Sequence, residues 1–170
     1  MKPLAILGMA AALAMQPTMA SAQGGDRIKF FTLEELQRAL DAIGATYVDA
    51  GDDRSINITF KSTLLANGLV MSCEDQETEL NCYGTSILAV FDPAPGTSEQ
   101  DIANAITQYN YNENFGRAYV DPSGDISVRI YIIADGGITR ENYRRQIELW
   151  SQSLEYFTTY LYPAEPKKKD

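Results

Sequence analysis

The chain has 170 residues, of which 45% are hydrophobic, and its 23 acidic and 14 basic side chains give a formal net charge of −9. An acidic surface repels nucleic acid and anionic lipid, because both need clustered lysines and arginines, so we expect no nucleic-acid partner. The sequence contains no histidine, which excludes histidine-based triads and general bases and most catalytic zinc sites.

Residues 1–22 are predicted to be a secretory signal peptide. Lys2 precedes an apolar run from Leu4 to Met15, and Ala20-Ser21-Ala22 forms an A-x-A cleavage site. The run is shorter than the roughly 20 residues that span a bilayer, and no cysteine for a lipid anchor directly follows it. We therefore expect cleavage between Ala22 and Gln23. The product would be a periplasmic or secreted protein with no membrane attachment after signal removal.

The first element predicted after the signal is a helix that begins near Thr32. Thr32 and Glu35 fit a capping box, and Gly44 suits the C-terminal cap. The intervening apolar residues recur at helical spacing: Leu33, Leu36, Leu40 and Ile43. Two strands follow, near residues 47–49 and 56–60, joined by a turn at 51–53. In the second strand, alternation places Ile56, Ile58 and Phe60 on one side and Asn57 and Thr59 on the other.

The two cysteines lie in apolar, β-branched segments that flank the polar centre "EDQETE". This pattern predicts an antiparallel hairpin with its turn near Glu77-Thr78. Pairing about that centre places Cys73 opposite Cys82, close enough for a disulfide, and export to an oxidising compartment favours its formation. Two free thiols are an alternative. A redox pair usually shows the C-x-x-C spacing, which differs from the C-x8-C spacing found here.

The segment "DPAPGTSEQ" ends the hairpin and introduces a middle helix, capped by Thr97 or Ser98. The helix carries Ile102, Ala105, Ile106 and Tyr109 at helical spacing. A strand from Phe115 to Val120 and a turn at 121–124 come next. The return strand then alternates Ile126, Val128, Ile130 and Ile132 with Ser127, Arg129 and Tyr131, as a strand with one wet face would.

A long final helix is predicted after Thr139, its N-cap, and ends before Pro163. Its apolar stripe advances in steps of four and three residues: Tyr143, Ile147, Trp150, Leu154, Phe157 and Leu161. The stripe suits packing on the sheet, but heptad-like spacing also suits a homodimer. The candidate dimer interface comprises Tyr143, Ile147, Trp150 and Leu154. Residues 163–170, with Lys167–Lys169, are predicted to be a flexible charged tail.

Together these elements predict a single α+β domain over residues 23–162. Their order is α-β-β-β-β-α-β-β-α, with an antiparallel sheet and helices packed on one of its faces.

No catalytic, metal-binding or cofactor-binding residue is predicted. Neither Asp121 nor Asp135 begins an EF-hand run, and Gly136-Gly137 suits a strand-to-helix turn better than an anion cradle. No serine lies in a G-x-S-x-G motif. Paired carboxylates stay open as a possibility, because acidic residues are plentiful and no pair stands out.

The stretch "NYNENFGRAYVDPSGDISVRIYIIADGGITRENYRRQIELWSQSLEYF" resembles the YbjN family, also described as bacterial sensory transduction regulators. The matching features are the N-x-N exit from the middle helix, the "GRAYVD…GDI" hairpin, the "GGIT" helix entry and the long last helix. The similarity extends over about Thr32 to Leu161. It implies a fold like that of type III secretion chaperones and a non-enzymatic, regulatory or adaptor role through protein binding. It supplies no catalytic residues. Secretion chaperones are cytosolic, whereas this chain looks exported.

Two functional hypotheses follow from the sequence. The first is an exported protein-binding or regulatory module of the YbjN type, with an unidentified protein partner and a candidate homodimer. The second is a periplasmic small-ligand or glycan binder, or a weak carboxylate-based hydrolase. Its cleft would be walled by tyrosines, namely Tyr47, Tyr109, Tyr111, Tyr119 and Tyr131.

Overall fold

The computed structural model describes residues 26–51, 54–75, 77–78 and 80–163. The predicted signal peptide, its cleavage site between Ala22 and Gln23, and the tail beyond Pro163 lie outside these residues. The elements run in chain order as β1 (Arg27–Ile28), α1 (Leu33–Ile43), β2 (Thr46–Asp49), β3 (Ser55–Thr59), β4 (Leu65–Asp75), β5 (Leu80–Phe91), α2 (Glu99–Asn112), β6 (Arg117–Val120), β7 (Ile126–Ile133), β8 (Ile138–Thr139) and α3 (Arg140–Leu161).

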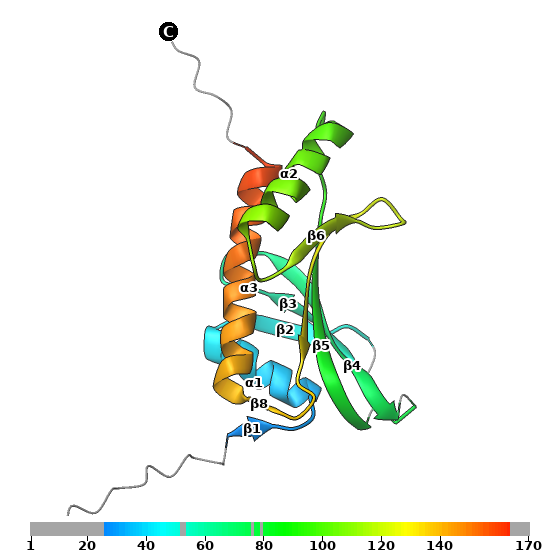
Figure 1. The fold of residues 1–170 in the computed structure, drawn as a ribbon, viewed down its shortest axis with the longest axis vertical. Coiled ribbons are helices and arrows are strands. Elements are labelled where there is room, and N and C mark those ends of the chain that lie inside the picture. Colours follow the sequence, from blue (N-terminus) through cyan, green and yellow to red (C-terminus); the bar gives the residue numbers. More distant parts are fainter. Residues whose placement is uncertain (1–25, 52–53, 76, 79, 164–170) are drawn as a thin grey trace, which may run out of the picture.

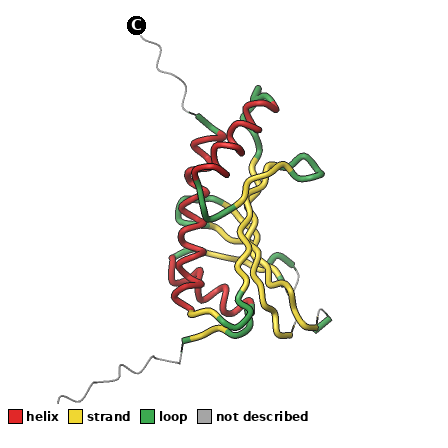
Figure 2. The backbone as a smooth tube through the Cα atoms, viewed as in Figure 1, coloured by secondary structure: helices red, strands yellow, loops and turns green. Residues whose placement is uncertain are grey.

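Six strands form one antiparallel sheet in the order β2-β3-β4-β5-β7-β6. The three helices lie on one side of this strongly twisted sheet, and no element of the described residues covers its other side (Figures 1 and 2). The α+β prediction and the predicted order of the larger elements are confirmed. The sequence did not predict β1 and β8, which pair with each other as a separate two-stranded sheet below α1 and α3.

The core lies between the helices and the inner face of the sheet. The α3 stripe supplies three of its largest side chains, Tyr143, Trp150 and Phe157. Four edge-on or tilted aromatic pairs join α3 to the rest of the described domain: Phe31 with Tyr143, Phe60 with Trp150, Phe91 with Phe157, and Tyr109 with Phe157. Aromatic pairs of this kind add to the stabilisation that burial itself provides. The long helix is therefore the central support of the monomer.

The predicted dimer interface on α3 is wrong. Tyr143, Ile147, Trp150 and Leu154 are all fully buried within the monomer. The hydroxyl of Tyr143 also exchanges a hydrogen bond of 2.9 Å with the buried hydroxyl of Thr85 on β5. Heptad-like spacing arose here because a straight helix lying along a sheet needs an apolar stripe of the same width as a helix lying along another helix.

The helix ends follow the predicted chemistry with one exception. Thr32 accepts a hydrogen bond from the Glu35 N–H, Ser98 forms a reciprocal capping box with Asp101, and Thr139 accepts from the Asn142 N–H. Gly44 ends α1 with a positive φ of 71°, as a C-terminal cap requires. The exception is the Glu35 carboxylate, which binds Arg140 instead of completing a capping box at Thr32.

The strand predicted from Phe115 begins two residues later, at Arg117. Gly116 passes so close to α2 and α3 that a Cβ atom there would lie 2.6 Å from the Tyr109 hydroxyl and 3.0 Å from the Trp150 ring. The chain is thus tightly packed at Gly116 before the ladder with β7 starts, and only glycine fits without a shift of these aromatic side chains.

The β4–β5 hairpin carries the predicted disulfide. Cys73 lies opposite Cys82 in the register, and their sulfur atoms are 2.00 Å apart. At the tip, the Asp75 carboxylate accepts hydrogen bonds from the N–H groups of Glu77 and Thr78, which fixes the predicted turn. The carboxylate of Glu74 binds the side chains of Asn81 and Tyr83. The hairpin is thus held by a covalent bond and by its own polar contacts.

Candidate protein-binding surface

The outer face of the six-stranded sheet displays large apolar side chains to solvent. Val48 is 65% exposed, Leu65 67%, Val90 53% and Ile133 57%. Successive side chains of a strand point to opposite faces, so these residues alternate with the core residues of the same strands. A soluble domain rarely gathers exposed apolar residues over one surface unless that surface binds something. We call this surface the open face.

One row of side chains crosses the open face from edge to edge. The register of all six strands places its members side by side: Val48, Asn57, Asn67, Leu88, Arg129 and Arg117. The row is apolar at the β2 edge, carries two amides next, returns to an apolar residue at Leu88, and ends on two arginines. Chemically different groups are therefore arranged in a fixed order along about five strand spacings of 4.7–4.9 Å each.

The β2 half of the open face is hollowed into a shallow groove of about 350 Å³. Its outward-facing lining is half aliphatic and half uncharged polar: Val48, Leu65, Leu88 and Val90 with Thr46, Asn57, Thr59 and Asn67. The Asn67 amide lies at its floor and donates to the Ile56 carbonyl at 3.3 Å and to the Asn57 side chain at 3.4 Å. No acidic residue lines this groove. The groove is thus suited to apolar side chains and lacks the paired carboxylates that hydrolysis would need.

The other half of the open face carries a cluster of two arginines and two tyrosines. Arg117 and Arg129 lie directly opposite each other on β6 and β7. The Arg117 guanidinium is 5.1 Å from the centre of the Tyr119 ring, and that of Arg129 is 5.8 Å from Tyr119 and 5.4 Å from Tyr131. Arg129 also donates to the Tyr131 hydroxyl. The rings hold both cations at the surface through cation–π contacts.

The arginines of this cluster differ from those of the helices. Among the residues that the structure describes, Arg38, Arg140, Arg144 and Arg145 each bind a carboxylate, whereas the ion pairs include neither Arg117 nor Arg129. The Nε of Arg129 is buried and has no hydrogen-bond partner in the described part of the protein. The cluster is therefore a positively charged area that no carboxylate of the described residues neutralises, on a chain with a net charge of −9.

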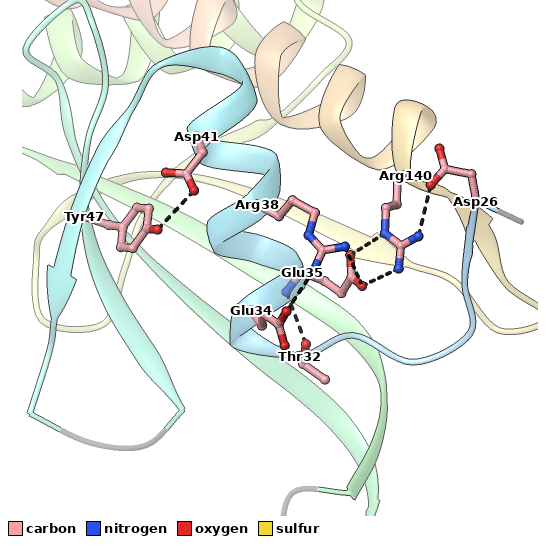
Figure 3. Close-up of polar contacts among 8 residues, drawn as sticks. All are labelled: Asp26, Thr32, Glu34, Glu35, Arg38, Asp41, Tyr47 and Arg140. Carbon is pink, nitrogen blue, oxygen red and sulfur yellow. Dashed lines mark hydrogen bonds and ion pairs between the residues drawn. The ribbon is translucent and has the colours of Figure 1, made fainter.

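The densest polar network lies on the opposite side of the molecule, between α1 and α3 (Figure 3). Arg140 binds both oxygens of Glu35, at 2.8 and 2.6 Å, and Asp26 at 3.0 Å. The hydrogen bonds from Arg140 lower the pKa of the Glu35 carboxyl, and its positive charge adds to this effect, although partial burial opposes it. The network fastens α1 and the segment before β1 to the start of α3.

The acidic and glycine-containing loops serve turn geometry. One Asp121 oxygen accepts from the N–H groups of Ser123 and Asp125, and Arg27 donates to the carbonyls of Gly136 and Gly137. Within the described ranges, no group of three acidic or cysteine side chains is placed to hold a metal ion, and no helix has the length and apolar character to cross a bilayer.

The five tyrosines proposed to wall a ligand cleft do not gather in one place. Tyr109 is buried and bonds Ser153, Tyr111 is exposed on α2, and Tyr47 lies against Asp41 of α1. Tyr119 and Tyr131 do lie together, on either side of Arg129. The structure therefore brings together two of the five, on a sheet face and without a deep pocket around them.

Comparison with known proteins decides the family. The model of the YbjN family, described as "Putative bacterial sensory transduction regulator", matches residues 32–162. The chain belongs to the YbjN family. No curated protein sequence matches it. Among solved structures, the crystal structure of YbjN from E. coli, described as "a putative transcription regulator", aligns with a TM-score of 0.57 at 12% identity, covering 75% of this chain and 88% of that chain.

Two other solved structures are similar at lower scores. A chain of the HopA1–SchA chaperone–effector complex has a TM-score of 0.47 at 13% identity, covering 75% of this chain and 91% of its own length. An uncharacterized protein from Methanothermobacter thermautotrophicus has a TM-score of 0.46 at 12% identity, covering 77% and 99%. The E. coli match shows that this chain shares the fold of another YbjN protein.

The sequence of this YbjN-family chain did not reveal the open face as a site. Alternation had placed Arg129 and Tyr131 on a wet face of their strand, but the position of Arg117 beside Arg129 depends on the register of β6 against β7. The joining of Val48 and Leu88 in one row likewise depends on three successive pairings. Exposed apolar residues at alternate strand positions were the available signal.

Proposed function

We propose that this YbjN-family protein is an exported, non-enzymatic adaptor or regulator that binds another protein through the open face. The observation that carries the proposal is the uncovered sheet face with its exposed Val48, Leu65, Val90 and Ile133. The family's description as a sensory transduction regulator supports a regulatory role. The sequence of residues 1–22 supports export.

The face, and not the β6 edge, is the docking surface. The outward backbone groups of Ala118 on β6 are occupied by the Asn110 side chain, which donates to the carbonyl at 2.9 Å and accepts from the N–H at 2.9 Å. An edge strand that is capped in this way cannot accept an added strand at that residue. A partner therefore gains more by covering the apolar side chains of the open face.

The carboxylates of the groove between α1 and α3 support a non-enzymatic role. The small groove of about 130 Å³ between α1 and α3 contains Asp26, Glu35 and Glu141. Each of these carboxylates is bound by an arginine, Arg140 or Arg144. The hydrogen bonds from Arg140 and Arg144 lower the pKa of the Glu35 and Glu141 carboxyls, so these two groups stay ionised and are poor general acids.

Site-specific photo-crosslinking in cells tests the proposal. A photoreactive amino acid is placed at Val90 or Leu65 on the open face, and at Tyr111 on the exposed side of α2 as the matched control. We expect a discrete crosslinked protein from the two open-face positions and none from Tyr111. Equal products from all three positions, or none from the open face, would contradict binding through this surface. N-terminal sequencing of the exported protein separately tests whether it begins at Gln23.

A further inference from the structure

We propose that the partner segment is acidic, with a carboxylate that binds between Arg117 and Arg129 and neighbouring apolar side chains that enter the groove. This inference rests on the proposed function, because it specifies what the open face binds. It is carried by the two arginines, by their relation to the groove and by the charge of the rest of the molecule.

The two arginines are placed at a cost to the folded protein. Like charges directly opposite each other on neighbouring strands are destabilising. Arg117 and Arg129 occupy such a pair, although the chain has 23 acidic residues that could have separated or neutralised them. The tyrosines offset part of this cost through cation–π contacts and one hydrogen bond from Arg129 to Tyr131, but they supply no negative charge as a carboxylate would.

A carboxylate from a partner would remove this repulsion. A guanidinium presents its N–H groups in a planar fork that matches the two oxygens of a carboxylate. Two guanidinium groups on one side of the sheet can hold one carboxylate or two adjacent ones.

The groove requires that the partner segment also carry apolar side chains next to its carboxylate. Leu88 lies directly opposite Arg129 in the register, and it also lines the groove together with Val90 and Leu65. The groove residues therefore lie one to four strand spacings from Arg129, from Leu88 on β5 to Val48 on β2. In an extended segment, residues two apart face the same way and lie about 6.5–7 Å apart. The fitting ligand has apolar residues two to four positions from its acidic residue.

Other occupants match the charge less well. The tail of this chain carries Lys167–Lys169 and would be repelled by the arginines. A second copy packed face to face would place either its own arginines or its uncharged groove against Arg117 and Arg129, and neither supplies a carboxylate. An anionic membrane offers negative charge, but two arginines on a chain of net charge −9 make a weak basic patch.

The test uses the mature protein and three synthetic peptides in a binding titration. The first peptide is extended and alternates Glu with Leu and Val on one face, the second carries Gln in place of Glu, and the third carries Lys. We expect the Glu peptide to bind, the Gln peptide to bind at least about tenfold more weakly, and the Lys peptide not to bind. Equal binding of the Glu and Lys peptides would overturn the proposal.

Variants locate the effect. The double variant Arg117→Gln, Arg129→Gln is expected to lose at least about tenfold in affinity for the Glu peptide, with an unchanged circular dichroism spectrum. Arg38→Gln is the matched control, because Arg38 is an exposed arginine on α1 and its loss should leave binding unchanged. If the double variant binds the Glu peptide as tightly as the unmodified protein, the assignment is wrong.

Three further outcomes separate this inference from the proposed function. If Val90 still crosslinks its partner in the double variant at full yield, the protein-binding role stands and the acidic segment is refuted. A membrane surface replaces the peptide as the ligand if three results coincide. Phosphatidylglycerol vesicles bind the unmodified protein, they do not bind the double variant, and none of the peptides binds. If the protein dimerises with increasing concentration and the double variant does not, a second copy replaces it.

Discussion

The two faces of one sheet use the same strands for opposite purposes. Val128 and Arg129 are neighbours on β7, yet the first is fully buried under the helices and the second belongs to the open face. On β5, Ala89 is buried and Val90 is 53% exposed. The buried apolar residues of the inner face belong to one core cluster with residues of α1, α2 and α3. The exposed apolar residues Val48, Leu65, Val90 and Ile133 of the open face lie outside that cluster, so they require a second explanation, which the proposed binding supplies.

The strongest way to test this contrast is to remove a core side chain from α3. Leu154→Ala is expected to lower the free energy of unfolding by about 2–5 kcal/mol, since it leaves a cavity among fully buried neighbours. Urea denaturation followed by circular dichroism measures the change. The loss should be similar at low and high protein concentration. If Leu154→Ala lowered the unfolding free energy only at concentrations where the protein is dimeric, Leu154 would belong to a dimer interface and not to the core of the monomer.

Removal of the disulfide should have the next largest effect. The bridge closes a loop with a sequence separation of 9, and the double variant Cys73→Ser, Cys82→Ser is expected to lose about 2–3 kcal/mol of unfolding free energy. The stabilisation arises mainly because the bridge restricts the unfolded chain. Urea denaturation compares this variant with the oxidised protein, and peptide mapping without reductant checks the bridge itself. Two free thiols in the purified exported protein would contradict the pairing.

The ion pairs of α1 provide a smaller and sharper contrast, because Glu34 and Glu35 are adjacent but differ in burial. Glu35 is partly buried and bound by two Arg140 nitrogens, whereas Glu34 is exposed and bound by Arg38. Glu35→Gln is expected to lower the unfolding free energy by about 1–3 kcal/mol, and Glu34→Gln by less than about 0.5 kcal/mol. Thermal denaturation of both variants measures the difference. Equal losses would show that burial does not decide the strength of these pairs.

The pH dependence of Glu35 follows from the direction of its pKa. Because the carboxyl has a pKa below its ordinary value of 4.5 in the folded protein, the unfolded state binds a proton first as the pH falls. The contribution of Glu35 is therefore fully present at neutral pH and is lost as the pH falls from about 4.5 through the lowered value. Glu35→Gln should reduce the acid-induced loss of stability over that range. If Glu35→Gln and the unmodified protein lost the same unfolding free energy over this pH range, the assignment to Glu35 would be contradicted.

The sequence was sufficient to predict most of the inner face. Capping residues such as Thr32 and Ser98 and the 4-3 stripe of α3 are local signals, because each depends on residues within a turn or two. The partner of the α3 stripe was ambiguous, because a buried helix stripe and a dimer stripe have nearly the same period. Only the full burial of Trp150 and its neighbours distinguishes them.

The parts that the sequence missed depend on contacts between distant segments. β1 and β8 are two residues each, too short for alternation to be recognised, and they pair across more than 100 residues. The link between Glu35 and Arg140 likewise joins residues 105 apart. The arginine pair of the open face needed the register of β6 and β7. Local propensity cannot supply such pairings, since they are set by tertiary packing.

Replacing valine by threonine, a substitution of nearly equal volume, should change the unfolding free energy by different amounts on the two faces of the sheet. The smaller change is expected on the open face. Val90→Thr replaces a methyl group with a hydroxyl group that stays in contact with water, so the unfolding free energy should change by less than about 0.5 kcal/mol. Partner binding should weaken by about fourfold, because roughly one buried methyl group, worth about 0.8 kcal/mol, is lost from the contact.

Val128→Thr is the matched control for this prediction, because its hydroxyl would enter the core between Ala118 and Ala89 without a ready acceptor. It should lower the unfolding free energy by about 1–3 kcal/mol. Urea denaturation of both variants measures the change in unfolding free energy. Titration of the partner identified by crosslinking against Val90→Thr measures the change in affinity. If Val90→Thr destabilises the protein as much as Val128→Thr does, the open face is covered within the folded protein itself, and its apolar residues need no partner to explain them.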